Sequence, residues 1–348
     1  MRRSVIVVRR HLMRAGTRPL TDADGREDSR THARMSLFWT YFALSAPLFA
    51  IVFVGYVLAL WRYWRREWTA HASKFVFSFA LPVLLFRLMS KLQELPPVDA
   101  RLLIAFFGGC LLVFLSGRWI ARTVFRQEGA ARSIFGVAGV FSNNVLLGVP
   151  LARLTLGERA MPAVALVLVF NALTLWTLLS VSIEWSRHGS LSLAGFGRTA
   201  AGVAKNPIVM SILIGAAFGL LGGRLPATVS VTLDFIADLA GPAALLVSGM
   251  GLAGYSVRRE WQQTIAICGL KLIVQPLTVW LLAVALGLPA IERSAVVLLA
   301  SLAVGANVYL MSVQYEALQG TIASSLVLST LLAAVTTPMF LALLRASG

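Results

Sequence analysis

The sequence predicts an all-α membrane protein with ten transmembrane helices in two inverted five-helix repeats. Three observations support this fold class: the composition, the spacing of the apolar segments and an internal repeat. Of 348 residues, 58% are hydrophobic and only 13% are charged, and the mean hydropathy is +0.78. One soluble core does not require so many apolar residues, whereas a bundle of membrane helices does.

Ten apolar segments follow Leu37, each close to the roughly 20 residues that a helix needs to cross about 30 Å of hydrocarbon. The predicted spans are residues 37–61, 72–92, 101–121, 132–156, 160–184, 206–223, 228–254, 262–286, 293–315 and 319–344. The longest loop, residues 186–205, is predicted to be a cytoplasmic linker. It separates a first repeat, residues 35–185, from a second repeat, residues 206–348.

The two halves are related in sequence. A shift of 160 residues superposes Pro47 on Pro207, Gly55 on Gly215, and Pro82 on Pro242. Leucine and valine matches often arise by chance in apolar sequence, whereas matched prolines and glycines rarely do. A repeat with an odd number of spans must enter the membrane from the opposite side, which predicts an inverted-repeat architecture.

Two predicted spans carry polar interruptions. Span four contains Ser142–Pro150 and span nine contains Gly305–Leu310. Adjacent amides, a glycine and a proline would interrupt a helix at a depth where lipid offers no hydrogen-bond partner. Broken helices in corresponding positions of two halves are typical of a secondary transporter and indicate its binding site.

The charge pattern fits membrane topology rather than nucleic-acid binding. The net charge is +16, but the Lys and Arg residues lie in short clusters between the apolar spans. Cys110 and Cys268 fall inside spans, as packing residues do, and the four histidines show no metal-ligand spacing. No phosphate-binding loop is present, so we expect no nucleotide, metal or other cofactor.

Lys and Arg are more numerous in the loops after spans one, three, five and seven. That side is therefore predicted to be cytoplasmic, with both termini outside. Residues 1–34 carry nine arginines, which oppose export of the N-terminus. We expect residues 1–34 to be a disordered tail or an extension that arises from a start codon placed too early, with Met35 as the true start.

Several segments resemble the auxin efflux carrier family of membrane transporters, including its bacterial members. They are Phe79-Ala80-Leu81-Pro82, Ser142 through Leu151, Lys205-Asn206-Pro207-Ile208, Gly241 through Gly249, and Ala306 through Tyr315. The resemblance implies crossing broken helices in spans four and nine around a small organic anion, such as a dicarboxylate in bacteria. It also implies a carrier in the bacterial inner membrane. This chain has Ala303 where many relatives have proline, so the second break is expected to rest on Gly305.

The predicted substrate-binding residues lie on the two interruptions: Asn143, Asn144, Gly148 and Pro150 on span four, and Gly305, Asn307 and Tyr309 on span nine. Half-helices that meet at such breaks direct backbone N–H groups at the gap, which suits a carboxylate. A bound ion or water would fit equally well. The amides could instead only bond neighbouring helices.

Three residues are candidates for ion or proton coupling: Asp238, Lys271 and Gln275. An ammonium deep in the membrane costs about 2.5–3.5 kcal/mol on insertion scales, so Lys271 should face protein or else reach toward the surface. We expect Asp238 to be its partner and Asp234 to be solvated. Such a pair could bind an ion, carry a proton or lock two helices together, whereas Gln275 fits a helix-to-helix hydrogen bond.

Three functions remain open from the sequence. The favoured one is a carrier that moves a small organic anion by alternating access. The second is a sodium- or proton-coupled symporter of another substrate with the plan of bile-acid symporters. The third is a membrane sensor or an intramembrane enzyme, for which the spans lack a cluster of catalytic side chains. A homodimer is compatible with the sequence.

Overall fold

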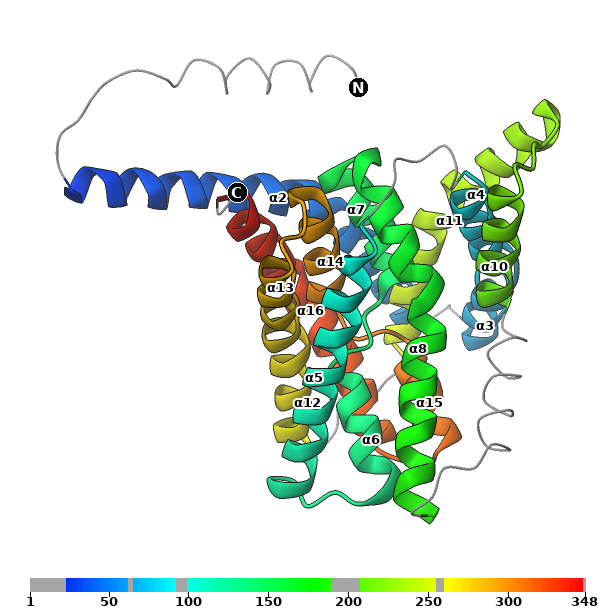
Figure 1. Ribbon diagram of the computed structural model, residues 1–348. Coiled ribbons are helices and arrows are strands. Elements are labelled where there is room, and N and C mark those ends of the chain that lie inside the picture. Colours follow the sequence, from blue (N-terminus) through cyan, green and yellow to red (C-terminus); the bar gives the residue numbers. More distant parts are fainter. Residues whose placement is uncertain (1–22, 62–64, 92–98, 189–206, 255–259, 347–348) are drawn as a thin grey trace.

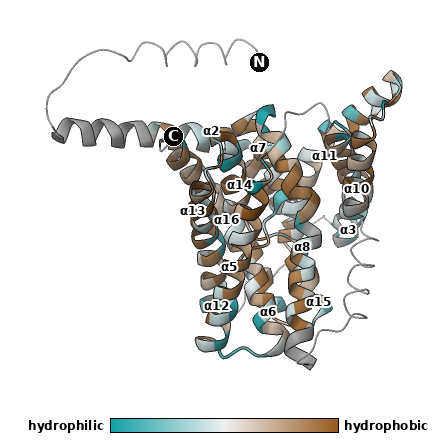
Figure 2. Ribbon diagram, viewed as in Figure 1, coloured by the Kyte–Doolittle hydropathy of each residue, from teal (hydrophilic) through white to brown (hydrophobic). Residues whose placement is uncertain are grey.

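The computed structural model describes residues 23–61, 65–91, 99–188, 207–254 and 260–346, which form a bundle of helices (Figure 1). Among these residues, seven helices are long and apolar enough to cross a membrane. They are Met35–Leu60, Glu67–Ser90, Arg101–Thr123, Glu158–Ile183, Ala227–Leu252, Trp261–Ala285 and Gln319–Arg345. Hydrophobic residues run along most of each helix, and hydrophilic residues gather toward the ends of several (Figure 2). The protein is therefore an all-helical, polytopic membrane protein.

The helices are named as in Figure 1, and the three wide turns η1, η3 and η5 join helix segments. The elements are α2 (Ala23–Leu60), α3 (Arg66–Phe75), η1 (Val76–Ala80), α4 (Leu81–Ser90), α5 (Arg101–Thr123), α6 (Gly129–Ala138), η3 (Asn144–Gly148), α7 (Val149–Leu156), η4 (Glu158–Ala160), α8 (Met161–His188), α10 (Pro207–Leu220), α11 (Ala227–Leu252), α12 (Trp261–Gly269), η5 (Leu270–Val274), α13 (Gln275–Ala285), α14 (Ala290–Ser301), α15 (Asn307–Gln314) and α16 (Gln319–Ala346). Predicted spans four and nine are the interrupted pairs α6–α7 and α14–α15. Predicted span six corresponds to the short helix α10.

The first helix begins earlier than expected. Residues Ala23–Arg34 belong to α2, and in Figure 1 the start of this helix extends beyond the rest of the bundle. A helix is possible here because no proline interrupts the chain between Ala23 and Pro47. The two interpretations of residues 1–34, a disordered tail or an extension from an early start codon, stay predictions. Residues 1–22 and the linker residues 189–206 lie outside the described residues. A start at Met35 stays a prediction.

Each of the three wide turns ends two residues before a proline. The backbone N–H groups of Leu81, Val149 and Gln275 donate to carbonyls five residues back instead of four. The next residue is Pro82, Pro150 or Pro276, which lacks an N–H and would collide with the preceding turn of a regular helix. The chain relieves that collision by widening the turn before each of these three prolines into a π-helical turn.

The helices associate in two groups. In the first group, α11 packs along α2 and α4, and α10 packs along α4; in the second, α5 contacts α6 and α13, and α16 contacts α12 and α14. Helix α2 also contacts α16 and joins the groups. Gly215 and Gly219 let α10 pack closely, since an added Cβ would lie within 3 Å of the α4 backbone at both positions.

The closest helix contacts follow the internal repeat. An added Cβ on Gly55 would lie 2.0 Å from the carbonyl oxygen of Leu246, and one on Gly215 would lie 2.8 Å from that of Phe86. A shift of 160 residues converts Gly55 into Gly215 and Phe86 into Leu246. The contact between α2 and α11 is thus repeated, with the halves exchanged, between α10 and α4.

Candidate functional site

The two predicted interruptions pair with each other through their backbones. Ser142, in the segment after α6, forms an antiparallel bridge with Val304, in the segment after α14. Two hydrogen bonds flank this bridge: from the Asn143 N–H to the Ala303 carbonyl (3.0 Å), and from the Gly305 N–H to the Phe141 carbonyl (2.8 Å). These bonds satisfy backbone groups that lipid could not. We call this pairing of residues 141–143 with residues 303–305 the crossing.

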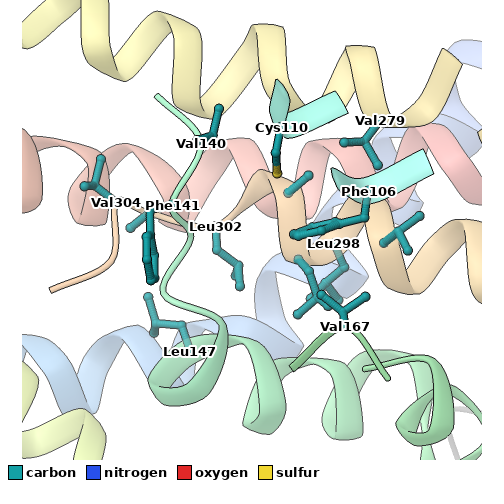
Figure 3. Packing of buried hydrophobic residues seen from close by; sticks show 14 of the residues in the cluster. Phe106, Cys110, Val140, Phe141, Leu147, Val167, Val279, Leu298, Leu302 and Val304 are labelled. Carbon is teal, nitrogen blue, oxygen red and sulfur yellow. The ribbon is translucent and has the colours of Figure 1, made fainter. Parts of the chain in front are cut away.

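The crossing leaves little room for a side chain at Gly305. A Cβ there would lie 3.0 Å from the carbonyl oxygen of Ser142 and 3.1 Å from the ring of Phe141. Figure 3 shows Phe141 and Val304 in the buried core beside the crossing. Helix α14 ends at Ser301 and Leu302 is extended, so the second break occurs without a proline at Ala303. That the break rests on Gly305 stays a prediction.

Lys271 and Gln275 hold the ends of the two helices that lead into the crossing. Both side chains are fully buried. The Lys271 Nζ donates to the carbonyl of Ala300 (2.6 Å), in the last turn of α14, and to the Gln275 Oε1 (2.7 Å). The Gln275 Nε2 in turn donates to the carbonyl of Val140 (2.8 Å), just beyond α6. Carbonyls at helix C-terminal ends lack partners within their own helix, so this pair of side chains supplies them.

Asp238 does not pair with Lys271, so that prediction is wrong. Asp238 is exposed and lines a separate pocket with Arg87 and Asp234. Asp234 is not simply solvated either, because Arg87 donates to both of its carboxylate oxygens (2.8 and 2.6 Å). The sequence showed that Lys271 needed a partner, but the partners are an amide four residues along and a backbone carbonyl, which spacing alone does not reveal.

A cavity of about 410 Å³ adjoins the crossing on its other side. Asn143, Asn307 and Tyr309 line it, so the structure brings together three of the predicted binding residues from the two broken helices. Its other lining residues are Ser73, Ser78, Leu146, Pro207, Val247, Ser248, Gly251, Leu252, Val304, Ala306, Leu310, Leu326 and Thr330. No charged side chain is among the described residues that line this cavity, which we call the inner cavity.

The remaining predicted residues lie beside the inner cavity rather than on its surface. Asn144 is buried and its Nδ2 donates to the Oδ1 of Asn171 (3.2 Å) on α8. Gly148 makes room for side chains of α14, since an added Cβ would lie 2.8 Å from Leu299. Pro150 starts α7 and Gly305 belongs to the crossing. None of these four residues is among the described residues that line the inner cavity.

Two helices begin at the inner cavity. Helix α15 starts at Asn307, and the η3–α7 segment starts at Asn144, directly after Asn143. A helix N-terminus carries a partial positive charge of about half an elementary charge and presents free N–H groups. Helix N-termini of this kind suit an anionic ligand, and the described lining adds no charged residue to them. The Ser248 side chain on α11, which was not among the predicted residues, also lines the cavity, whereas the Thr330 hydroxyl on α16 donates to the Leu326 carbonyl (2.7 Å) within its own helix.

An apolar cluster shares residues with the inner cavity and with a second pocket. The cluster consists of Val76, Ala80, Leu81, Leu84, Leu146, Ala237, Ala240, Ala244 and Val247. Leu146 and Val247 also line the inner cavity, whereas Leu84 and Ala237 also line the second pocket, of about 350 Å³. We call the cluster the apolar seal and the second pocket the charged pocket.

The charged pocket contains compensated charges. Besides the Arg87–Asp234 pair, Lys91 lies 3.5 Å from Asp234, and Arg153 forms an ion pair with Glu158 (2.9 Å). The two cavities therefore differ in character. One is polar but uncharged among its described residues, and the other is lined by opposite charges.

The chain belongs to a family of membrane transporters. The family model described as "Membrane transport protein" matches residues 40–203 and 199–341, which together span most of the chain. The predicted resemblance to the auxin efflux carrier family is thereby confirmed.

Two similar proteins carry names that indicate transport. A Rhizobium meliloti (strain 1021) protein named "Putative malonate transporter" is 29% identical over 313 residues, 88% of this chain and 96% of the relative. A rice protein (Oryza sativa subsp. japonica) named "Probable auxin efflux carrier component 5a" is 29% identical over 148 residues, 41% of this chain and 40% of the relative. The family and both relatives are transporters, which is consistent with a chain that is not an enzyme.

Proposed function

We propose that this protein is a secondary carrier of small carboxylates and that the inner cavity binds the substrate. The observation that carries the proposal is the meeting of Asn143 and Asn307, from two broken helices, on one cavity at two helix N-termini. Amide N–H groups and helix N-termini both suit a carboxylate. The name of the Rhizobium relative makes malonate the first substrate to test.

The proposed transport path runs from the inner cavity through the apolar seal to the charged pocket. In the described conformation the seal shares residues with both cavities. Alternating access requires that a binding site open to one side at a time. Because Leu146 of η3 belongs to the seal, a shift of the crossing relative to α4 and α11 would open the path on the other side.

The proposed architecture has ten spans in two inverted repeats. It is supported by the repeat-related contacts of Gly55 and Gly215 and by the symmetric hydrogen bonds around the Ser142–Val304 bridge. The loop charges favour a cytoplasmic inner cavity and termini outside a bacterial inner membrane. Cysteines introduced at Arg65 and Arg126, in a Cys110- and Cys268-free background, should react only from the cytoplasmic side, and labelling from outside would refute this orientation.

Cation coupling is not needed to explain the crossing. In many transporters, carbonyl groups at helix C-terminal ends and in unwound segments coordinate a bound Na⁺. Here Lys271 and Gln275 bond the carbonyls of Ala300 and Val140 themselves. This arrangement favours a carrier without sodium coupling over the symporter alternative.

A ligand panel tests the proposed function. Purified protein in detergent would be unfolded thermally with malonate, succinate and acetate, and with malonamide as a neutral analogue of malonate. The proposal predicts that a dicarboxylate raises the unfolding temperature and that malonamide does not, because the helix N-termini favour negative charge. Equal effects of malonate and malonamide, or no effect of any carboxylate, would refute the proposal.

A further inference from the structure

A third pocket lies away from the transport path, between α5, α6 and α8. Its volume is about 460 Å³ and its lining consists of Phe114, Leu115, Arg118, Trp119, Arg122, Arg132, Leu178, Val181 and Ser182. In Figure 1 these three helices stand together at the end of the bundle that carries the α5–α6 connection. Three arginines thus line one pocket, and no acidic residue is among the described residues of its lining.

The three arginines differ from others in the protein. Arg87, Arg101 and Arg153 each form an ion pair with a carboxylate. In contrast, the ion pairs of the described residues include none with Arg118, Arg122 or Arg132. The Arg132 Nε is also buried and has no hydrogen-bond partner within the described part of the chain. The like charges of Arg118 and Arg132 repel each other, and an anion in the pocket would relieve that repulsion and supply the missing acceptor.

Contacts with neighbouring side chains fix the position of Arg118 in the pocket. Arg118 donates to the hydroxyl of Ser182, which is hydrogen-bonded to Ser133 (2.7 Å), and its guanidinium carbon lies 5.8 Å from the centre of the Phe114 ring. Ser133 and Ser182 are buried, so these contacts fix the direction of the Arg118 side chain. A fixed guanidinium binds a phosphate with less loss of conformational entropy than a free one.

Apolar side chains continue from the arginines onto the outer surface of α5. Leu115 and Trp119 are 52% and 66% exposed, on a helix that is long and apolar enough to span the membrane. A phosphate held by the arginines would therefore have a hydrophobic surface directly beside it. This combination matches a phospholipid, whose acyl chains need such a surface, better than a free phosphate ion.

We propose that this pocket binds the headgroup of an anionic phospholipid, with Arg118, Arg122 and Arg132 on the phosphate and the acyl chains along Leu115 and Trp119. The site is separate from the carrier function, because none of its residues lines the inner cavity, the seal or the charged pocket. Basic pockets between helices at one membrane face are an established mode of anionic lipid recognition.

The test compares lipids by thermal unfolding of the purified protein in detergent. Phosphatidylglycerol is added at increasing mole fraction, and phosphatidylcholine with the same acyl chains serves as the neutral reference. Wild-type protein should unfold about 3–5 °C higher with phosphatidylglycerol than with phosphatidylcholine. Arg122→Gln and the double variant Arg118→Gln/Arg132→Gln should lose most of this difference. Arg126→Gln, in the α5–α6 connection and outside the pocket lining, should keep this difference.

Four results would overturn the proposal. They are equal stabilisation by the two lipids, a preserved lipid preference in both pocket variants, loss of the preference in Arg126→Gln, and reproduction of the shift by inorganic phosphate. The last result would identify a site for a free anion instead. Because Arg122 is exposed, its replacement should leave folding intact. The Arg122→Gln variant therefore decides the test if the double variant does not fold.

Discussion

The broken helices start on one side of the crossing and end on the other, and the two kinds of helix end have different partners. On one side, the starts of η3 and α15 adjoin the inner cavity, where Asn143 and Asn307 are available to a ligand. On the other side, the ends of α6 and α14 are closed by the buried pair Lys271 and Gln275. The negative helix ends are thus satisfied by the protein itself, and we propose that the positive ends serve the substrate.

This difference assigns separate tasks to polar residues that look alike in the sequence. Changes on the cavity side should reduce substrate affinity, and changes on the closed side should reduce stability. Changes to the crossing should disturb both. The following predictions test this division, from the largest expected effect to the smallest.

The largest effect is expected at the crossing itself. Gly305→Val would place side-chain atoms where even a Cβ lies 3.0 Å from the Ser142 carbonyl. The backbone pairing cannot form without movement of both segments, so we expect little correctly folded protein and no substrate transport. Size-exclusion chromatography and uptake in proteoliposomes measure this. Gly269→Ala is the matched control, because an added Cβ there meets nothing within 4 Å. A Gly305→Val protein that folds and transports normally would contradict the account.

The next largest effect is expected at Lys271. Lys271→Ala removes both donated hydrogen bonds and leaves a cavity, which should lower the free energy of unfolding by about 3–5 kcal/mol. Propylammonium, which replaces the lost atoms, should restore part of the unfolding temperature. Na⁺ should stabilise this variant but not the wild type. Lys74→Ala, at an exposed lysine, is the control.

Two outcomes would contradict the proposal that the Lys271 ammonium takes the place of a bound Na⁺ at the helix ends. The first is a wild-type protein that is itself stabilised by Na⁺ relative to choline. The second is a Lys271→Ala variant whose lowered unfolding temperature responds to neither Na⁺ nor propylammonium. Lys271→Met, which fills the space without a donor, should be less stable than the wild type and should show no rescue.

A smaller effect is expected at Asn144, which bonds Asn171 away from the inner cavity. Asn144→Ala should lower the free energy of unfolding by about 1 kcal/mol and change substrate affinity less than twofold. Asn143→Ala, one residue earlier, should weaken substrate binding and leave the free energy of unfolding nearly unchanged. Calorimetric binding of malonate and thermal unfolding of both variants measure the contrast, and a larger affinity loss in Asn144→Ala would assign the wrong amide to the cavity.

The sequence was sufficient for the architecture around the site because the relevant signals are local. The apolar segments, the paired interruptions and the glycine at position 305 all follow from what a helix in lipid can and cannot tolerate. The partner of Lys271 was not predictable in this way. An acidic side chain was the expected partner, but Lys271 donates to the backbone carbonyl of Ala300. Every residue has a backbone carbonyl, so the sequence does not indicate which one is the partner.

The lining of the cavity was only partly predictable for a related reason. Asn143 and Asn144 are adjacent and chemically identical, and only the direction of each side chain separates a cavity residue from a helix-to-helix bond. Ser248 and Thr330 lie within long apolar helices where a hydroxyl usually bonds its own helix. Their place on the cavity depends on which helix faces the crossing, and that is a property of the packed bundle.

The most direct test of the central claim is a double-mutant cycle on Asn143 and Asn307 with malonate binding as the readout. If both amides contact one ligand, each single change to Ala should weaken binding roughly ten- to a hundredfold, through loss of about 1.5–3 kcal/mol per charged hydrogen bond. The double variant should then lose less than the sum of the two single losses. Strictly additive losses, or normal malonate binding in both single variants, would contradict a shared site at the crossing.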